Sequence, residues 1–205
     1  MWTFFSSLNA NWYNSREAYE FHKEKSRQLA LVKKMDVRIP ETLITNNCDA
    51  AKAFIKQNKE AIFKPVCGGA LTEMVSEVHL MDGQLASAFK YAPVTLQRYV
   101  DGTNIRTYVI EDQVFSAEIR SDKKDFRADS DAELIPIDTP NDIHACALKV
   151  CKVLALRWTA IDWRRSAAGE YFFLEANPSP MFLHFENITG YPVSRSLVEC
   201  LIKLR

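Results

Sequence analysis

The sequence predicts an α+β protein with two subdomains, mostly antiparallel sheets, and helices on one face of each sheet. The chain has 205 residues, of which 47% are hydrophobic, and this suffices for one large or two small globular units. Segments with apolar residues at helical spacing alternate with short apolar runs that end at turn residues. We divide the chain into an N-terminal segment and helix (1–37), a small subdomain (38–96) and a large subdomain (97–205).

The first half of the chain predicts a helix followed by a small sheet unit. Residues 15–35 are charged, lack Gly and Pro, and carry apolar residues on one face, so they predict a single amphipathic helix capped by Ser15. Further elements follow in order: a strand at 41–45, a helix at 48–58 capped by Asp49, a strand at 61–66, a glycine turn at 67–70, an ambiguous segment at 73–81, a helical segment at 85–89 and a strand at 94–100.

The second half predicts a larger sheet with two helices. A hairpin formed by 105–112 and 113–121 turns near Glu111 and Asp112, and the polar stretch 122–134 predicts a loop. The remaining elements are a helix at 141–156 capped by Asn141, strands at 158–165 and 170–177 joined by a short turn, and a helix at 191–204.

Composition excludes several classes of protein. Lys plus Arg equals Asp plus Glu, at 26 each, so no overall field attracts nucleic acid or an anionic membrane surface. The five cysteines form no CxxC pair, which indicates reduced packing thiols in a cytoplasmic protein rather than a zinc site or a disulfide framework. The N-terminus does not read as a signal peptide, and no apolar run approaches the roughly 20 residues of a membrane span.

Three oxygen-bearing side chains predict a metal site. Glu175 and Asn177 stand two residues apart on one predicted strand, so their side chains share a face. Asp162 lies on the preceding strand, which we expect to be its antiparallel neighbour. Carboxylate and amide oxygens suit Mg²⁺, which takes one or two carboxylates together with substrate phosphates. The alternative is that Glu175 is a paired sheet carboxylate and Asn177 a turn residue.

A lysine beside a glycine pair predicts an anion site. Lys64 lies inside an otherwise apolar strand, where a buried ammonium needs a partner. Gly68 and Gly69 follow, and glycines let backbone N–H groups approach a phosphate closely. The order of a Walker loop is absent, and a hairpin turn explains two glycines equally well.

Polar residues after the strand at 94–100 complete the set of candidates. Gln97, Arg98 and Tyr99 end that strand and offer backbone groups to a purine edge. The candidates for binding carboxylate or phosphate are three arginines, Arg106, Arg120 and Arg127. We expect Arg106 and Arg120 to share a face of the hairpin; the alternative is a solvated sheet face. His184 and Glu186 follow the candidate metal strand closely, and their role stays open.

The order of these residues resembles the ATP-grasp superfamily. The matching features are Lys25, Lys64 with Gly68 and Gly69, and the segments "LQRYV", "NIR", "DFR", "AID" and "LEANPSP". Within the superfamily the chain is most similar to the branch of RimK-type ribosomal-protein glutamate ligases, glutathione-synthetase-like ligases and microviridin-type (graspetide) peptide ligases. The resemblance runs from about residue 9 to the C-terminus; the final motif is specific and the others are individually loose.

The resemblance implies an ATP-grasp fold, in which two α+β subdomains clasp ATP. Lys25 and Lys64 would then contact phosphates, the loop at 67–70 would close over them, the connector from Gln97 to Val100 would hold adenine, and Asn104 would contact ribose. Asp162, Glu175 and Asn177 would hold one or two Mg²⁺ ions. Arg106, Arg120 and Arg127 would surround the γ-phosphate and the acyl intermediate.

The implied chemistry is the ATP-dependent joining of a carboxylate to an amine or a hydroxyl through an acyl phosphate, on a peptide or amino-acid-like substrate. The sequence departs from the family because about 100 residues of a usual N-terminal domain do not precede Lys25. We therefore expect a partner chain or a homodimer to complete the site. The alternative function is a nucleotide-binding ATP-grasp module that regulates or completes a partner enzyme without ligating. Ala160 argues against the D-alanine ligase branch, which has arginine there.

Overall fold

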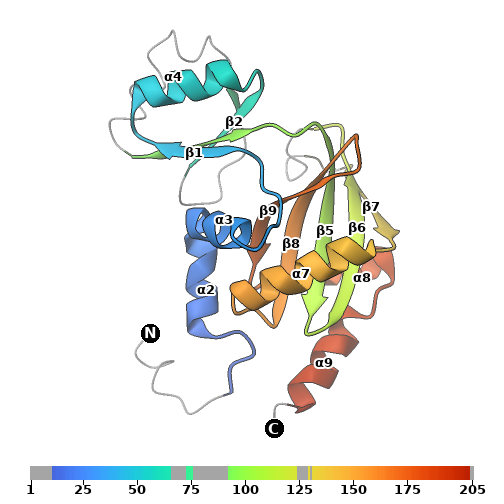
Figure 1. The fold of residues 1–205 in the computed structure, drawn as a ribbon. Helices are drawn as coiled ribbons and strands as arrows, with labels where there is room; N and C mark the ends of the chain where they lie inside the picture. The colour runs from blue at the N-terminus through green and yellow to red at the C-terminus, as the bar shows by residue number, and fades with distance from the viewer. Residues whose placement is uncertain (1–10, 66–72, 76–91, 124–128, 130, 204–205) are drawn as a thin grey trace.

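The computed structural model contains two antiparallel sheets with helices packed on them, so the α+β prediction is confirmed (Figure 1). It describes residues 11–65, 73–75, 92–123, 129 and 131–203. The smaller sheet has the order β1-β4-β2-β3, formed by Thr42–Thr45, Val94–Arg98, Ala61–Pro65 and Glu73–Val75. The larger sheet has the order β7-β6-β5-β8-β9, formed by Glu133–Ile137, Gln113–Arg120, Gly102–Ile110, Trp158–Ser166 and Tyr171–Asn177.

The smaller sheet packs one face against helix α4 (Cys48–Gln57), which covers its outer side in Figure 1. Phe54 and Ile55 of α4 join Leu96 of β4 in a buried cluster. Lys64 is one residue away from the inward-pointing Phe63 and directly opposite Thr95. The alternation of side chains along a strand therefore turns Lys64 and Gln97 to the face opposite α4.

The larger sheet carries helices on both faces, so the expectation of helices on one face only is wrong for this sheet. Helices α7 (Asn141–Val153) and α3 (Lys25–Lys33) pack on the face that contains Ile105 and Trp163. Helices α8 (Leu183–Thr189) and α9 (Val193–Lys203) pack on the face that contains Tyr108. The apolar sequence of β5 and β8 explains this, because residues on both sides of these central strands are buried.

The predicted N-terminal helix is interrupted. Helix α2 (Arg16–Lys23) begins after Ser15, whose hydroxyl accepts a hydrogen bond from the amide of Ala18, as the cap prediction requires. The single helix expected over 15–35 is wrong, because Glu24 leaves helical geometry (φ −102°, ψ 62°) and α3 begins at Lys25. Residues 16–33 thus form two short helices, and α3 packs on β9.

Other boundaries differ from the predictions in their caps. Asn47, not Asp49, caps α4, because its side-chain oxygen accepts hydrogen bonds from the amides of Asp49 and Ala50. Pro140 precedes α7 without a side-chain cap, and Asn141 is already helical. Strand β7 takes up the end of the predicted loop at 122–134, and α8 was not predicted.

The link between the sheets is short. Strand β4 ends at Arg98 and β5 begins at Gly102, so the chain passes from one sheet to the other within a few residues. The division at residue 97 stays a prediction. No helix in the described part of the chain is long and apolar enough to cross a membrane.

Candidate active site

The three predicted metal ligands lie on one face of the larger sheet. Strands β8 and β9 are antiparallel neighbours, with Asp162 opposite Glu175 and Ala160 opposite Asn177. Directly opposed residues of a pair point to the same face. A bulge at Leu174 makes this possible. Phe173 and Ala176 are three residues apart, yet both point into the core on the face that α3 and α7 cover. The bulge thus turns Glu175 and Asn177 out of that core.

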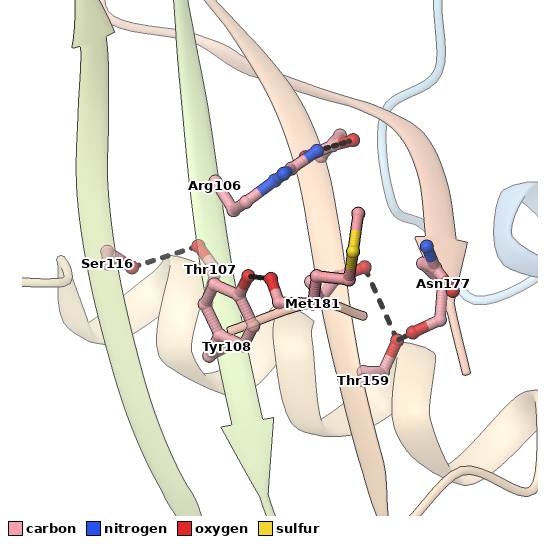
Figure 2. Close-up of polar contacts among 9 residues, drawn as sticks. Arg106, Thr107, Tyr108, Ser116, Thr159, Asn177 and Met181 are labelled. Atoms are coloured by element: carbon pink, nitrogen blue, oxygen red, sulfur yellow. Dashed lines mark hydrogen bonds and ion pairs between the residues drawn. The ribbon is translucent and has the colours of Figure 1, made fainter. Parts of the chain in front are cut away.

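Arg106 joins this face from β5, where it stands opposite Asp162. Its Nε and Nη2 donate to the two carboxylate oxygens of Asp162 at 2.8 and 2.9 Å, and Figure 2 shows the guanidinium reaching across to β8. Burial alone would lower the pKa of Arg106, but the carboxylate of Asp162 outweighs it and raises the pKa above its ordinary value. The pair is a fixed, charged feature of the site.

Lys25 reaches Glu175 from helix α3. Its Nζ lies 2.5 Å from Oε2 of Glu175, and the two side chains are 33% and 27% exposed. The break at Glu24 makes Lys25 the first residue of the helix that packs on β9. Both carboxylates of the predicted metal site therefore face a cation supplied by the chain itself.

The segment after β9 is held in place by backbone bonds. The side-chain oxygen of Asn177 accepts a hydrogen bond from the amide of Ser179 at 3.0 Å, and its backbone oxygen accepts one from the buried hydroxyl of Thr159 at 2.8 Å (Figure 2). The Tyr108 hydroxyl donates to the carbonyl of Met181 at 2.6 Å, and burial raises the pKa of Tyr108. These bonds fix the "NPSPM" turn against β5 and β8.

Lys64 lies on the smaller sheet and contacts Gln97. Its Nζ donates to Oε1 of Gln97 at 3.2 Å, while Nε2 of Gln97 donates to the hydroxyl of Thr42 at 2.9 Å. Gln97 is only 2% exposed. The two predicted nucleotide-binding residues are thus brought together, and Gln97 fixes the position of the lysine.

Arg164, which was not among the predicted site residues, holds Tyr99 and Val100 of the connector in place. Nε of Arg164 donates to the carbonyl of Val100 at 2.9 Å, Nη2 donates to the Tyr99 hydroxyl at 2.8 Å, and the guanidinium lies 5.3 Å from the centre of the Tyr99 ring. The amides of Arg98 and Tyr99 donate to the carbonyls of Glu41 and Glu60. Several of the backbone groups expected to face a purine are therefore bonded within the protein.

A cavity of about 490 Å³ lies beside this connector. Its lining includes three predicted site residues, Tyr99, Asn104 and Arg120, together with Arg164 and Glu118. The cavity is lined mainly by polar and charged side chains, which suits a polar ligand.

Arg106 and Arg120 do not share a face of the sheet, so that expectation is wrong. Arg106 pairs with Ala117 in the β5–β6 register, and Arg120 is an odd number of residues further along β6. Nε of Arg120 donates to Glu118 at 3.1 Å. Burial alone would raise the pKa of Glu118, but Arg120 and Arg165 outweigh it and lower that pKa.

Several candidates are placed away from the site or outside the described residues. Gly68, Gly69 and Arg127 lie outside them. Glu186 accepts hydrogen bonds from the amide and hydroxyl of Ser194, so it caps the start of α9. His184 is exposed on α8. Burial raises the pKa of Cys151 to about 12, which disfavours the reactive thiolate form.

The donor set on the β8–β9 face fits magnesium. It offers two carboxylates and one amide oxygen, the hard ligands that Mg²⁺ prefers. Within the described residues no group of three His, Cys, Asp or Glu side chains stands ready to hold a metal, so oxygens of the amide and of a bound substrate would have to complete the coordination.

Comparison with known proteins gives one consistent result. Residues 22–201 match the family model described as the RimK-like ATP-grasp domain. The tetrahydromethanopterin:alpha-L-glutamate ligase of Methanocaldococcus jannaschii is 23% identical over 177 residues, which cover 80% of this chain and 60% of that protein. The chain thus spans less than two thirds of that relative.

Solved structures of ATP-grasp ligases share the fold. The RiPP-associated ATP-grasp ligase of Chryseobacterium gregarium, in complex with ADP and a leader and core peptide, is 28% identical with a TM-score of 0.89, and the match covers 99% of this chain and 66% of that one. The ATP-grasp ligase PsnB, complexed with a phosphomimetic variant of a minimal precursor, Mg and ADP, is 30% identical with a TM-score of 0.83, covering 94% of this chain and 62% of that one.

Proposed function

Because the chain belongs to the RimK-like ATP-grasp family, we propose that it is an ATP- and Mg²⁺-dependent ligase that joins a carboxylate to an amine or a hydroxyl. The observation that carries the proposal is the charged face of the larger sheet, where Asp162, Glu175 and Asn177 point the same way beside Arg106 and Lys25.

Asp162, Glu175 and Asn177 would hold one or two Mg²⁺ ions. When bound there, Mg²⁺ would neutralise charge on the phosphate oxygens of ATP. The carboxylates would then exchange part of their contact with Lys25 and Arg106 for the metal. The released ammonium of Lys25 would be placed to meet a phosphate, as the sequence predicts.

The nucleotide would lie between the two sheets. Lys64, held by Gln97, would contact its phosphates from the smaller sheet, and Gly68 and Gly69 would offer backbone amides to them. The connector from Gln97 to Val100 would hold adenine, and Asn104 would contact the ribose. The cavity beside the connector, lined by Tyr99 and Asn104, supports this placement.

The reaction would use no protein nucleophile. An oxygen of the substrate carboxylate forms a bond to the γ-phosphorus of ATP while the bond from that phosphorus to the β–γ bridging oxygen breaks, which releases ADP. The amine or hydroxyl of the acceptor then attacks the acyl carbon, phosphate leaves with its electron pair, and the acceptor loses a proton. Arg106 would stabilise the negative charge of the transferred group and the acyl phosphate, and we propose the same role for Arg127; Arg120 points to the other face of the sheet.

The substrate that we favour is a peptide with acidic side chains. Both structural relatives described above were solved with peptides or peptide precursors, and at 28% and 30% identity they match nearly all of this chain. A partner chain or a second copy of this chain would contribute further contacts to such a substrate.

Release of ADP in the presence of such a peptide tests the proposal. The protein is incubated with ATP, Mg²⁺ and a peptide that contains Glu or Asp together with Lys, Ser or Thr, and ADP and the peptide mass are followed. The expected result is ADP release that depends on the peptide, with loss of one water per bond formed. ATP binding without peptide-dependent ADP release would contradict ligation and favour the nucleotide-binding module considered above.

A further inference from the structure

A buried glutamine attaches helix α3 to the strand that carries two of the proposed metal ligands. Gln28 is 1% exposed. Its Nε2 donates to the carbonyl of Ala176 at 3.0 Å, and its Oε1 accepts a hydrogen bond from the amide of the same residue at 2.9 Å. One side chain therefore satisfies both backbone groups of Ala176.

This contact replaces a neighbouring strand. Among the described residues of the larger sheet, β9 is an edge strand that pairs only with β8. The outward backbone groups of an edge strand need other partners when they are buried. Earlier along β9, the amide of Phe173 donates to the carbonyl of Arg38 at 2.8 Å. The amide group of Gln28, which donates through Nε2 and accepts through Oε1, continues this substitute pairing at Ala176.

The position of the contact matters because Ala176 stands between Glu175 and Asn177. It lies two residues after the bulge at Leu174, where β9 departs from regular pairing. A bulge weakens the constraint that β8 places on the strand, so the direction of the next side chains depends on what holds their backbone. The contact with Gln28 is such a constraint, made at the edge of the sheet.

We propose that Gln28 is a positioning residue for the metal site: by fixing the backbone of Ala176 it sets the direction of the Glu175 and Asn177 side chains. This inference rests on the proposed function. Helix α3 then acts twice, since Lys25, one turn before Gln28, contacts Glu175 directly. Groups that orient metal ligands without touching the metal typically change metal affinity by about 10- to 100-fold when they are removed.

The test compares Gln28→Met with Val150→Ala. Methionine keeps the length of the side chain but offers no comparable hydrogen bonds to Ala176. Val150 is fully buried in the same core on α7, so its truncation is a control for a general loss of stability. Calorimetry measures the affinity of each folded protein for ADP, first without metal and then at increasing Mg²⁺ concentrations. The quantity compared is the Mg²⁺ concentration at which half of the gain in ADP affinity is reached.

We expect Gln28→Met to raise the half-saturating Mg²⁺ concentration by about tenfold or more, with metal-free ADP binding nearly unchanged and Val150→Ala like the wild type. Gln28→Glu, which when protonated still offers one donor and one acceptor, should lie between Gln28→Met and the wild type, and it carries the test if the methionine variant does not fold.

Two contrary outcomes can be told apart. If Mg²⁺ strengthens ADP binding by the wild type but Gln28→Met, or Gln28→Glu in its place, needs no more Mg²⁺ than Val150→Ala does, the positioning role is wrong while the proposed function stands. If Mg²⁺ has no effect on ADP binding by the wild type, the proposed metal site is wrong, and the role of Gln28 with it.

Discussion

At the scale of single residues, the candidate site is a set of mutually neutralised charges. Asp162 and Glu175 are both only partly exposed, and each contacts a cation, Arg106 or Lys25. Two carboxylates on neighbouring strands would repel each other without these partners. The cations therefore stabilise the fold and hold the two proposed metal ligands in place.

Removing one member of such a pair should cost more than removing a surface cation. Arg106→Met leaves the carboxylate of Asp162, which is 17% exposed, without its bidentate partner, so we expect the free energy of unfolding to fall by about 1–3 kcal/mol. Arg195→Met is the control, because the Arg195 side chain is 80% exposed in its pair with Glu199 and should change stability by about 0.5 kcal/mol or less. Urea unfolding measures both, and equal losses would contradict the account.

The lowered pKa of Glu118 predicts a particular dependence on pH. Its carboxylate, held by Arg120 and Arg165, binds protons more weakly in the folded than in the unfolded protein. Its contribution is therefore present above the ordinary pKa of a glutamate, about 4.3, and is lost as pH falls through the lowered folded value. Between neutral pH and about pH 3.5 the wild type should lose more unfolding free energy than Glu118→Gln; parallel losses would contradict this.

At the scale of elements, the sequence predicted the strands better than their surroundings. The apolar residues of "WTAIDWRR" and "EYFFLEAN" predicted β8 and β9, and the short turn between them predicted their pairing, from which the shared face of Asp162, Glu175 and Asn177 followed. The bulge at Leu174 could not be predicted, because local sequence does not encode which pairing is skipped. The break of the N-terminal helix at Glu24 has a similar cause, since α3 takes its position from its contacts with β9.

Some functional contacts left weak signals in the sequence. Gln28 precedes Leu29 on the apolar face of a helix, and a polar residue there indicates a buried partner, but not which one. Arg164 follows Asp162 by two residues and so shares its face. The separation of Arg106 from Arg120 depends on the register of the hairpin, which the approximate position of the turn did not fix.

Gly102 is the first residue of β5, directly after the link between the sheets, and its substitution should have a specific effect on stability. Gly102 has φ +149°, and a Cβ atom there would lie 2.0 Å from the carbonyl oxygen of Arg165. Gly169, in the β8–β9 turn, has φ +81° with nothing within 4 Å of the same position. Gly169→Ala should cost about 1 kcal/mol, the usual cost of left-handed backbone, and Gly102→Ala clearly more, because the backbone must also move.

Thermal and urea unfolding of the two glycine variants measure this difference. Gly102→Ala should also weaken nucleotide binding. Gly102 lies two residues after Val100, whose carbonyl Arg164 holds, so a shift of the backbone at Gly102 would displace the connector. A Gly102→Ala protein as stable as Gly169→Ala would show that the connector is not held tightly against β8.

At the scale of the whole molecule, the proposed function requires both sheets. Lys64 belongs to the smaller sheet, whereas Lys25 and the metal ligands lie on or beside the larger one. Neither sheet carries the complete set of groups for a nucleotide with its metal, and the short link between Arg98 and Gly102 keeps them joined.

Lys64→Ala should therefore weaken ATP binding more than about tenfold, because a charge-assisted contact to phosphate is lost. The Mg²⁺ dependence of the remaining binding should stay as in the wild type, since the metal ligands lie on the other sheet. Lys56→Ala, at an exposed position of α4, is the control for loss of a positive charge. Calorimetric titration with a non-hydrolysable ATP analogue gives both affinities; equal affinities would remove Lys64 from the site.

The Mg²⁺ dependence of ADP binding by Glu175→Gln, beside Glu170→Gln, tests the central claim most directly. Both substitutions remove one negative charge from the region of β9, but Glu175 lies on the Asp162 face whereas Glu170 lies in the turn and contacts Arg38 at 3.6 Å. We predict that Mg²⁺ strengthens ADP binding by the wild type and by Glu170→Gln, and has little effect on Glu175→Gln. Equal enhancement by Mg²⁺ in all three proteins would contradict the account.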